Sequence, residues 1–309
     1  MQLLNESTVL PEEIDSLGHM NVRHYMTRME QANRVLIAHL GIDAATLADS
    51  FLRRTDSYMR FRREQFEGAT LHATGGVLDS DEEGMRSYVE ITNPDSGDLA
   101  ATFIVTTALI DSATRRPLAL REPEGPVAYV EVPDFARPRS LSLGGANPSV
   151  SLEELDARIP DVEGEGMMSG RRDITIDESD VNAASWLRED VELMFLPFAK
   201  MSQAAGFKQG PPPFQTAEGH RIGWAVMEGR MQTFGQPRLG DELAYRSADV
   251  GLEEKSRRSR RWAFDKGTGK LLGIHDTLGV CIDLEARRAV PWPDELRQQI
   301  ARHLQPDLA

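Results

Sequence analysis

The chain has 309 residues, with 49 acidic and 35 basic side chains and a formal net charge of −14. That length allows two domains of ordinary size, and a hydrophobic content of 40% is enough for a packed core. The net negative charge argues against nucleic acid as a partner, because phosphate binding needs basic surface.

The composition also limits the compartment and the kind of site. A single cysteine, Cys281, allows neither an internal disulfide nor a zinc site built from thiolates. The first residues show no basic stretch followed by an apolar one, so we expect no secretory signal. No apolar run approaches the ~18–20 residues of a membrane span. We therefore expect a cytoplasmic protein without a membrane partner, and the seven histidines show no metal-ligand spacing.

The first elements predicted along the chain are a short strand and a long helix. The strand at residues 7–10 precedes a loop at residues 11–21, and the helix starts at Val22. Apolar residues recur every three or four positions as far as Leu40, which predicts one buried stripe. Gly41 stands where a glycine commonly caps the end of a helix.

Four runs typical of strands follow the helix, at residues 58–61, 70–78, 86–91 and 99–111. The sequence NPDSG at residues 93–97 is typical of a turn that joins the last two runs as a hairpin. A long helix followed by antiparallel strands predicts an α+β domain in which a sheet wraps one helix.

The chain contains this pattern twice. A shift of 165, which places Asp15 on Asp180, aligns residues 8–41 with the second half without a gap. Beyond the helix the shift becomes 172 and places Gly97 on Gly269. A constant shift over such a length predicts a duplicated domain.

A different composition separates the two copies. Residues 137–170 are rich in glycine, proline, serine and acidic residues, which indicates a linker. We therefore expect a first domain at residues 1–136 and a second domain at residues 171–309.

Residues 15–25 read DSLGHMNVRHY, and they resemble the motif D-x-x-G-H-x-N-x-x-x-Y of hotdog-fold thioesterases. The chain is similar to the 4-hydroxybenzoyl-CoA thioesterase-like group and to its two-hotdog branch, the plant acyl-ACP thioesterases. The resemblance implies a double hotdog, with two tandem hotdog domains that each wrap an antiparallel sheet around a long central helix. It also implies hydrolysis of an acyl-CoA or acyl-ACP thioester, no cofactor besides the coenzyme A of the substrate, and a homodimer as one arrangement of such chains.

The resemblance gives each motif residue a role. It implies that Asp15 is the general base or nucleophile and that the Val22 amide forms part of the oxyanion hole. His19 and Asn21 would orient the base, the water or the thioester, and Gly18 would allow the chain to approach the substrate closely. Physical chemistry agrees, because free N–H groups at a helix N-terminus stabilise a developing oxyanion and a nearby carboxylate can activate water or attack.

Structural roles compete with these functional ones. Asp15 can hold a turn, His19 can be an ordinary loop histidine, and Asn21 is a good N-cap for the helix. Tyr25 is expected in the core. The plant-type branch has an asparagine two residues after the aspartate, where this chain has Leu17, which favours the simpler mechanism of an aspartate plus a helix N-terminus.

The second copy retains little of the motif. Under the shift of 165, Asp180 remains, while the glycine, histidine and asparagine are replaced by Ala183, Ala184 and Trp186. We therefore expect the second half to be mainly structural, with Trp186 in the wall of the substrate pocket.

Two basic segments stand out in this acidic chain. Arg62 lies in the sequence RFRR, and Arg258 lies in the sequence SRRSRR. Both segments fit a solvated edge strand, where charge prevents aggregation. Both also fit contact with the phosphates of CoA or with an acidic carrier protein, and the sequence leaves the two readings open.

Other functions rank below a thioesterase. Hotdog hydratases and dehydratases resemble a D-x-N-P-x-H pattern, which differs from the spacing of Asp15 and His19. A non-catalytic acyl-CoA binding or sensing protein is the alternative outside the enzymes. The sequence does not indicate the acyl group. His275 and Cys281 alternate with apolar residues, and we expect both in the core.

Overall fold

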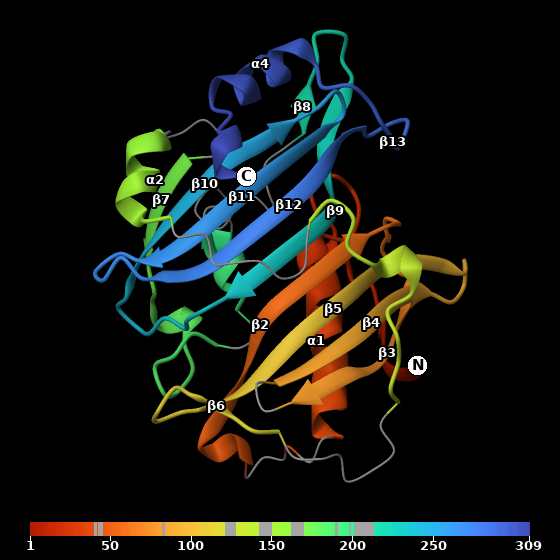
Figure 1. Ribbon diagram of the computed structural model, residues 1–309. Coiled ribbons are helices and arrows are strands. Elements are labelled where there is room, and N and C mark those ends of the chain that lie inside the picture. The colour runs from red at the N-terminus through yellow and green to blue at the C-terminus, as the bar shows by residue number, and fades with distance from the viewer. Residues whose placement is uncertain are drawn as a thin grey trace. The chain divides into compact units, whose positions relative to one another are not determined.

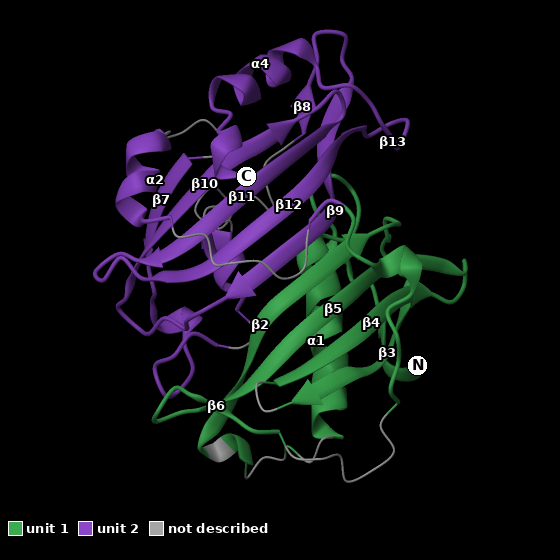
Figure 2. Ribbon diagram, viewed as in Figure 1, with its two compact units in different colours: residues 1–139 green, residues 140–309 purple. Residues whose placement is uncertain are grey.

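The structure is a computed structural model of the full chain (Figure 1). It describes residues 1–39, 42, 46–81, 84–120, 128–141, 150–161, 170–188, 191–197, 199–200 and 213–309. The chain divides into two compact units, Met1–Arg139 and Ser140–Ala309 (Figure 2). Within the described ranges, no helix is long and apolar enough to cross a membrane.

Unit 1 is an antiparallel sheet with one long helix against it (Figure 1). The strands are β1 (Gln2–Thr8), β2 (Ser50–Phe61), β3 (Thr70–Asp81), β4 (Gly84–Asn93), β5 (Asp98–Asp111) and β6 (Pro117–Leu118). They pair in the order β1-β3-β4-β5-β2, with β6 beside β5. The helix α1 (Val22–Ala38) packs against β1, β3 and β4.

The predicted apolar stripe of α1 is confirmed, because its buried residues include Tyr25, Met29 and Leu36. One buried residue of the stripe is polar. Asn33 donates a hydrogen bond to Thr107 Oγ1 at 2.8 Å and accepts one from Ser87 Oγ at 2.7 Å, so burial leaves its amide satisfied. The predicted C-cap at residue 41 lies outside the described residues.

The hairpin of β4 and β5 is confirmed with small changes at its ends. The first predicted run is longer than expected, because β2 begins at Ser50. The first part of this strand contains charged residues, so it does not form the apolar run from which a strand is predicted. Arg54 reaches α1, where its guanidinium lies 3.4 Å from the Glu30 carboxylate. This ion pair compensates the charge of Arg54 within the strand.

Unit 2 repeats the strand order of unit 1. Its strands are β7 (Gly170–Thr175), β8 (Phe214–Gln215), β9 (Arg221–Thr233), β10 (Glu242–Leu252), β11 (Ser256–Asp265), β12 (Leu271–Asp283) and β13 (Arg288–Ala289). They pair in the order β7-β10-β11-β12-β9, with β13 beside β12 and β8 beside β9. The helices α2 (Leu152–Arg158) and α4 (Asp294–Arg302) also belong to this unit.

The backbone of the turns supports the predicted repeat beyond the helix. Gly97 has φ +74° and Gly269 has φ +69°, and the uncommon positive φ of Arg115 (61°) recurs at Arg287 (50°). Non-glycine residues seldom adopt this conformation. The shift of 172 therefore aligns positions that have the same backbone conformation in the two units.

Part of the predicted linker is ordered and packed, which differs from the expectation. Residues 152–158 form α2, whose Leu155 is buried in a cluster that includes Ile159, Trp262 and Phe264. The high content of glycine and acidic residues in the segment led to the prediction of a linker, although Leu155 and Ile159 are buried. The division into domains at 1–136 and 171–309 stays a prediction.

The arginine-rich segment of unit 2 is not a solvated edge strand, so that reading is wrong. It forms β11, which pairs with β10 on one side and with β12 on the other. Arg260 binds the Asp276 carboxylate through two bonds of 2.7 and 2.9 Å, and Arg257 binds the buried Asp249. Carboxylates on the neighbouring strands neutralise these arginines.

The two residues of β12 that were expected in the core are buried. Only 5% of His275 is exposed, and burial lowers its pKa to about 3. Cys281 is also buried, and burial raises its pKa to about 11. Both groups are therefore neutral at physiological pH, as core residues should be.

Candidate functional site

The motif of unit 1 folds into a tight hairpin immediately before α1. The Gly18 N–H donates to the Asp15 carbonyl oxygen, and the Asp15 N–H donates to the His19 carbonyl oxygen, both at 3.0 Å. Ile14 and Met20 close the hairpin as an antiparallel bridge. Gly18 has φ +83°, a conformation that glycine adopts without strain, so the turn itself accounts for the glycine of the motif.

The carboxylate of Asp15 is held in one orientation and shielded from water. Its side chain is 7% exposed. One oxygen accepts the Leu17 N–H at 2.8 Å, and the other accepts the Asn21 Nδ2–H at 3.1 Å. Burial raises the pKa of Asp15, and the opposing effects of His19 and of these hydrogen bonds are weaker. A carboxylate with a raised pKa is a better proton acceptor than an ordinary one.

Asn21 combines the two roles that the sequence left open. Its Oδ1 accepts the Arg23 N–H at 3.1 Å, so it is the N-cap of α1, while its Nδ2 holds Asp15. The next amide, that of Val22, is the first of the helix, and no acceptor for it lies among the described residues. The structure therefore ties a buried carboxylate to the N-cap residue of a helix, and the first amide at the positive end of that helix has no acceptor among the described residues.

His19 lies between two carboxylates. Its Nε2 is 3.3 Å from Glu64 Oε1, and its Nδ1 is 4.0 Å from Asp15 Oδ1. The same Nδ1 lies 3.2 Å from the Met20 carbonyl oxygen. Sequence reasoning missed Glu64. No local pattern marks it, because it reaches His19 only through the fold, where the Met20 N–H binds the carbonyl oxygen of Gln65 at 2.8 Å.

A buried ion pair fastens the hairpin to α1. Arg28 donates to both carboxylate oxygens of Glu13, at 2.7 and 3.0 Å, and its other N–H groups bind Ser7 Oγ and the carbonyl oxygens of Thr8 and His24. All five donors of the guanidinium are thus used. Because the Glu13 carbonyl oxygen accepts the Asn21 N–H at 2.9 Å, the ion pair also fixes the end of the hairpin.

Tyr25, expected in the core, is buried and edge-on to Phe61. Its hydroxyl donates to the Arg63 carbonyl oxygen at 3.1 Å. This bond ties α1 to the segment that carries Glu64.

Unit 2 builds the same hairpin, and its hydrogen bonds show which residues correspond. The Ser185 N–H donates to the Asn182 carbonyl oxygen, and the Asn182 N–H donates to the Trp186 carbonyl oxygen. Val181 and Leu187 form the bridge. Asn182 therefore takes the place of Asp15 in this hairpin.

The alignment of Asp15 with Asp180 is wrong by two residues. The Asp180 carbonyl oxygen accepts the Arg188 N–H, and its carboxylate accepts the Asp177 N–H, which are the bonds that Glu13 makes in unit 1. Asp180 is paired with Lys200 at 2.7 Å. It therefore corresponds to the structural Glu13. Matching Asp to Asp hid the register that the backbone hydrogen bonds define.

The corrected register leaves unit 2 without the carboxylates and the imidazole of the site. In unit 2, Asn182 takes the position of Asp15, Ser185 that of Gly18 and Trp186 that of His19. Arg188 matches Asn21, and Gln236 matches Glu64. No ionisable acid or imidazole remains at these positions. That the second half is mainly structural stays a prediction.

The residues predicted to bind substrate lie in different settings. Trp186 takes the place of His19, not that of Asn21 as the sequence alignment had it, and its ring stacks under the Arg238 guanidinium, 4.3 Å from the ring centroid. Arg258 lies on the interior strand β11, half-buried. Arg62 follows β2 and lies near the surface, two residues before Glu64. Their binding roles stay predictions.

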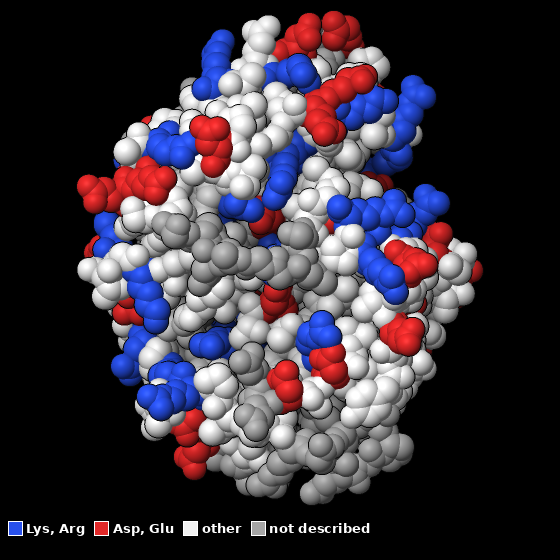
Figure 3. Space-filling view, viewed as in Figure 1, with Lys and Arg blue, Asp and Glu red and all other residues white. Residues whose placement is uncertain are grey.

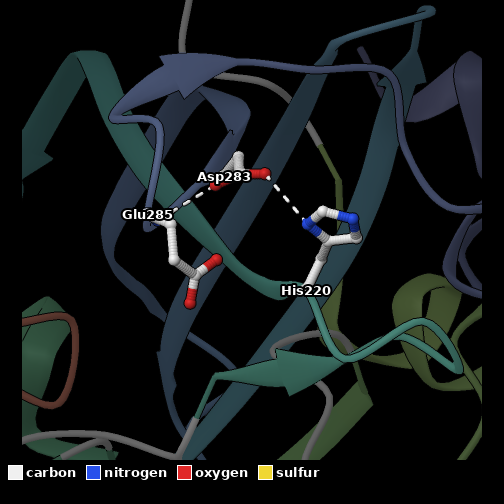
Figure 4. Close-up of side chains that lie close together, drawn as sticks. All are labelled: His220, Asp283 and Glu285. Atoms are coloured by element: carbon white, nitrogen blue, oxygen red, sulfur yellow. Dashed lines mark hydrogen bonds and ion pairs between the residues drawn. The ribbon is translucent and has the colours of Figure 1, made fainter.

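One group in unit 2 has the composition of a cation site. His220, Asp283 and Glu285 place one ligand atom each within 4.8 Å of one another (Figure 4). Asp283 already accepts the N–H groups of Glu285 and Ala286, as Asp111 does at the matching turn of unit 1. The turn explains the position of Asp283, and His220 is a solvent-exposed side chain beside it.

Comparison with known proteins agrees with this geometry. The family model of the Thioesterase-like superfamily matches residues 9–138, the part of the chain that carries the site. Residues 9–138 are a thioesterase-like domain. The family resemblance read from the motif is confirmed over these residues, and the activity that it implies is hydrolysis of a thioester. No curated protein sequence matches the chain significantly.

Solved structures extend the fold resemblance over both units of the chain. An acyl-ACP thioesterase from Bacteroides thetaiotaomicron matches with a TM-score of 0.60 and 11% identity, over 89% of this chain and 96% of its own. The 12:0-ACP thioesterase from Umbellularia californica matches with 0.62 and 13%, over 89% and 92%. A putative oleoyl thioesterase from Lactobacillus plantarum gives 0.58 and 11%, over 93% and 96%. The fold is that of the hotdog thioesterases.

Proposed function

We propose that the protein is a thioester hydrolase that acts on an acyl-CoA or acyl-ACP and performs the reaction at the hairpin of unit 1. Water and the thioester give the free acid and the thiol. The observation that carries the proposal is the buried Asp15 carboxylate, with its raised pKa, which Asn21 ties to the N-terminus of α1, where the Val22 amide has no acceptor among the described residues. Unit 2 has no such pair among the residues described there.

Asp15 would act as general base on water or as nucleophile on the thioester carbon. In either case negative charge develops on the carbonyl oxygen, and the Val22 N–H with the positive end of α1 would stabilise it. Asn21 keeps the carboxylate in place through its 3.1 Å bond. A dry setting strengthens these electrostatic effects.

His19 and Glu64 would complete the site as a pair. In the described part of the chain, His19 Nε2 lies 3.3 Å from Glu64 Oε1 without making a hydrogen bond, and its Nδ1 lies 4.0 Å from Asp15, so the imidazole faces both carboxylates. It would position the attacking water or protonate the leaving thiolate, and Glu64 would hold it for that role.

The same proposal covers the architecture and the partners. The shared strand order of the two sheets and the helix α1 support a double hotdog with a central helix. We propose that no cofactor beyond the substrate's coenzyme A takes part, that the enzyme is cytoplasmic, and that two such chains form a homodimer. Size-exclusion chromatography with light scattering tests the dimer.

A panel of acyl-CoA and acyl-ACP thioesters, followed by thiol release and by acid formation, tests the activity. We expect equal amounts of thiol and acid from at least one substrate class. Formation of a 3-hydroxyacyl thioester from an enoyl thioester, without thiol release, would instead identify a hydratase. Tight binding without turnover of any substrate would identify a binding protein.

The pair of His19 and Glu64 can be tested by a double-mutant cycle. His19→Gln and Glu64→Gln are each expected to lower kcat about 100-fold, the usual contribution of a positioned acid–base group. The double variant should be no slower than the slower single variant, because the two residues act as a unit. Glu67→Gln, which changes an exposed glutamate of the same segment, is the control and should keep wild-type turnover. Fully multiplicative losses in the double variant would show that the residues act separately.

A further inference from the structure

Two arginines at the end of β2 converge on one peptide carbonyl. Arg60 Nη1 and Arg62 Nη2 each lie 2.5 Å from the carbonyl oxygen of Phe135. A guanidinium has five N–H donors, and each arginine uses one of them among the residues that the structure describes. The Nε of Arg62 is buried without a hydrogen-bond partner there. Most of the donors of the two guanidinium groups therefore make no hydrogen bond to the described part of the chain.

These arginines also differ from others of unit 1 in charge balance. Arg28 and Arg86 each pair with a carboxylate. In the described part of the chain, no carboxylate lies within ion-pair distance of Arg60 or Arg62. Burial, followed by the positive charges of Arg60 and Arg139, lowers the pKa of Arg62, and Tyr88 and Glu90 oppose this shift more weakly. The cluster holds like charges together, which favours binding of an anion.

The fold does not require arginine at these two positions. The Arg62 N–H binds the Ala100 carbonyl oxygen, and the Phe234 N–H of unit 2 binds that of Leu272 in the same way. This register places Gln232 and Phe234 at the matching positions. The arginines thus occur in the unit that retains the carboxylate site and are absent from the unit that has lost it.

An exposed aromatic ring adjoins the cluster. Phe135, in the short helix Asp134–Ala136, is 40% exposed, and the Arg62 guanidinium carbon lies 5.1 Å from its ring centroid. Basic side chains gather over this helix and the end of β2 in the space-filling view (Figure 3). Aromatic rings and arginine planes are common surfaces for stacking a nucleic-acid base.

We propose that Arg60, Arg62 and Phe135 bind the nucleotide end of coenzyme A, with the guanidinium groups on its phosphates and the ring against its adenine. The inference rests on the proposed function, since it specifies acyl-CoA as the substrate. Glu64, beside His19, is two residues from Arg62, so the cluster and the reacting groups lie near the same end of β2. The flexible pantetheine arm joins the two parts of the ligand.

Two close guanidinium groups suit the concentrated charge of phosphates. An acidic carrier protein offers carboxylates spread over a helix and no base for the ring. The observations therefore favour CoA, and the carrier protein becomes an outcome of the test.

Calorimetric titration with adenosine 3′,5′-bisphosphate tests the site without any thioester chemistry. The Arg60→Gln/Arg62→Gln variant should bind at least ~10-fold more weakly than wild type, a loss of about 1.4 kcal/mol, because it removes charged hydrogen bonds to the phosphates. Arg86→Gln removes an exposed arginine that is paired with Asp79 and should bind as wild type does. The single variants Arg60→Gln and Arg62→Gln serve as a second test if the double variant does not fold. Unchanged affinity in the folded variants would overturn the proposal.

Kinetics provides a second arm. The double variant should raise KM for the preferred acyl-CoA about 10-fold with little change in kcat, and the rise should shrink at high salt, where charge pairs are screened. KM for the matching acyl-pantetheine, which lacks the nucleotide, should not change. An equal rise for acyl-pantetheine, or a rise confined to acyl-ACP, would contradict a nucleotide site. If neither the wild type nor any variant hydrolyses a thioester, the proposed function fails. The titration still shows whether the nucleotide binds at the arginines.

Discussion

Replacing Asp15 by asparagine is expected to lower kcat at least ~100-fold, the scale of a lost general base or of lost charge stabilisation. The variant keeps the size of the side chain and removes its charge. KM should stay within a few-fold, because the carboxylate is required for the reaction and not for holding the acyl group or the nucleotide. Initial rates of thiol release over a range of substrate concentrations separate the two constants.

The pH dependence of the wild-type enzyme checks the same residue. Burial raises the pKa of Asp15, and only the ionised carboxylate can accept a proton or attack. As pH falls through this raised pKa the carboxylate is protonated, so kcat/KM should fall at a higher pH than an ordinary aspartate would give. The residual activity of Asp15→Asn should lack this acidic limb. Near-normal turnover in the variant, or an unchanged limb, would remove Asp15 from the mechanism.

Removing Arg28 should have the largest effect on stability. Arg28→Met removes the guanidinium from the Glu13 carboxylate, which is 12% exposed. That carboxylate keeps the Leu10 amide and His24 nearby, and losing one member of a buried ion pair costs about 3–5 kcal/mol. The loss should appear as a lower midpoint of chemical unfolding followed by fluorescence. Arg34→Met, on the exposed side of the same helix, is the control and should cost less than about 1 kcal/mol.

The same ion pair should respond to pH. Burial opposes ionisation of Glu13, but the hydrogen bonds from Arg28 and the Leu10 amide outweigh it, so the pKa of Glu13 is lowered. A lowered pKa stabilises the folded state above the ordinary pKa of glutamate, and that stability is lost as pH falls through the lowered value.

The double variant Glu13→Gln/Arg28→Met should recover part of the stability that Arg28→Met loses, since no charge stays buried. An Arg28→Met protein as stable as the control would show that the pair does not hold the hairpin.

Much of unit 1 could be predicted because its signals are local. The stripe of α1, its N-cap Asn21 and the hairpin of β4 and β5 follow from side-chain period and turn residues. The beginning of β2 could not be predicted, because Arg54 is compensated by Glu30 on α1, a contact that exists only after folding.

The candidate site shows a similar limit. The motif marked Asp15, His19 and Asn21, which the hairpin brings together. Glu64 lies far along the chain and carries no motif of its own. Its place beside His19 depends on the pairing of Met20 with the segment after β2.

The comparison of the two copies shows how weak similarity misleads. At low identity, a match of Asp15 to Asp180 looks better than a match to Asn182. Backbone hydrogen bonds fix the register independently of side-chain type, and they show that the aspartate of unit 2 does the work of Glu13. The two hairpins therefore differ in more of the motif positions than the sequence alignment indicated.

Turnover of the Asn182→Ala and Asp180→Asn proteins, measured beside Asp15→Asn on the preferred thioester, tests most directly whether the chemistry belongs to unit 1 alone. Asn182 occupies the place of Asp15 in unit 2, and Asp180 pairs with Lys200. We expect both unit 2 variants to stay within about threefold of wild-type kcat, the range of substitutions outside an active site, while Asp15→Asn loses nearly all activity. A well-folded Asn182→Ala or Asp180→Asn protein that is as inactive as Asp15→Asn would contradict this assignment.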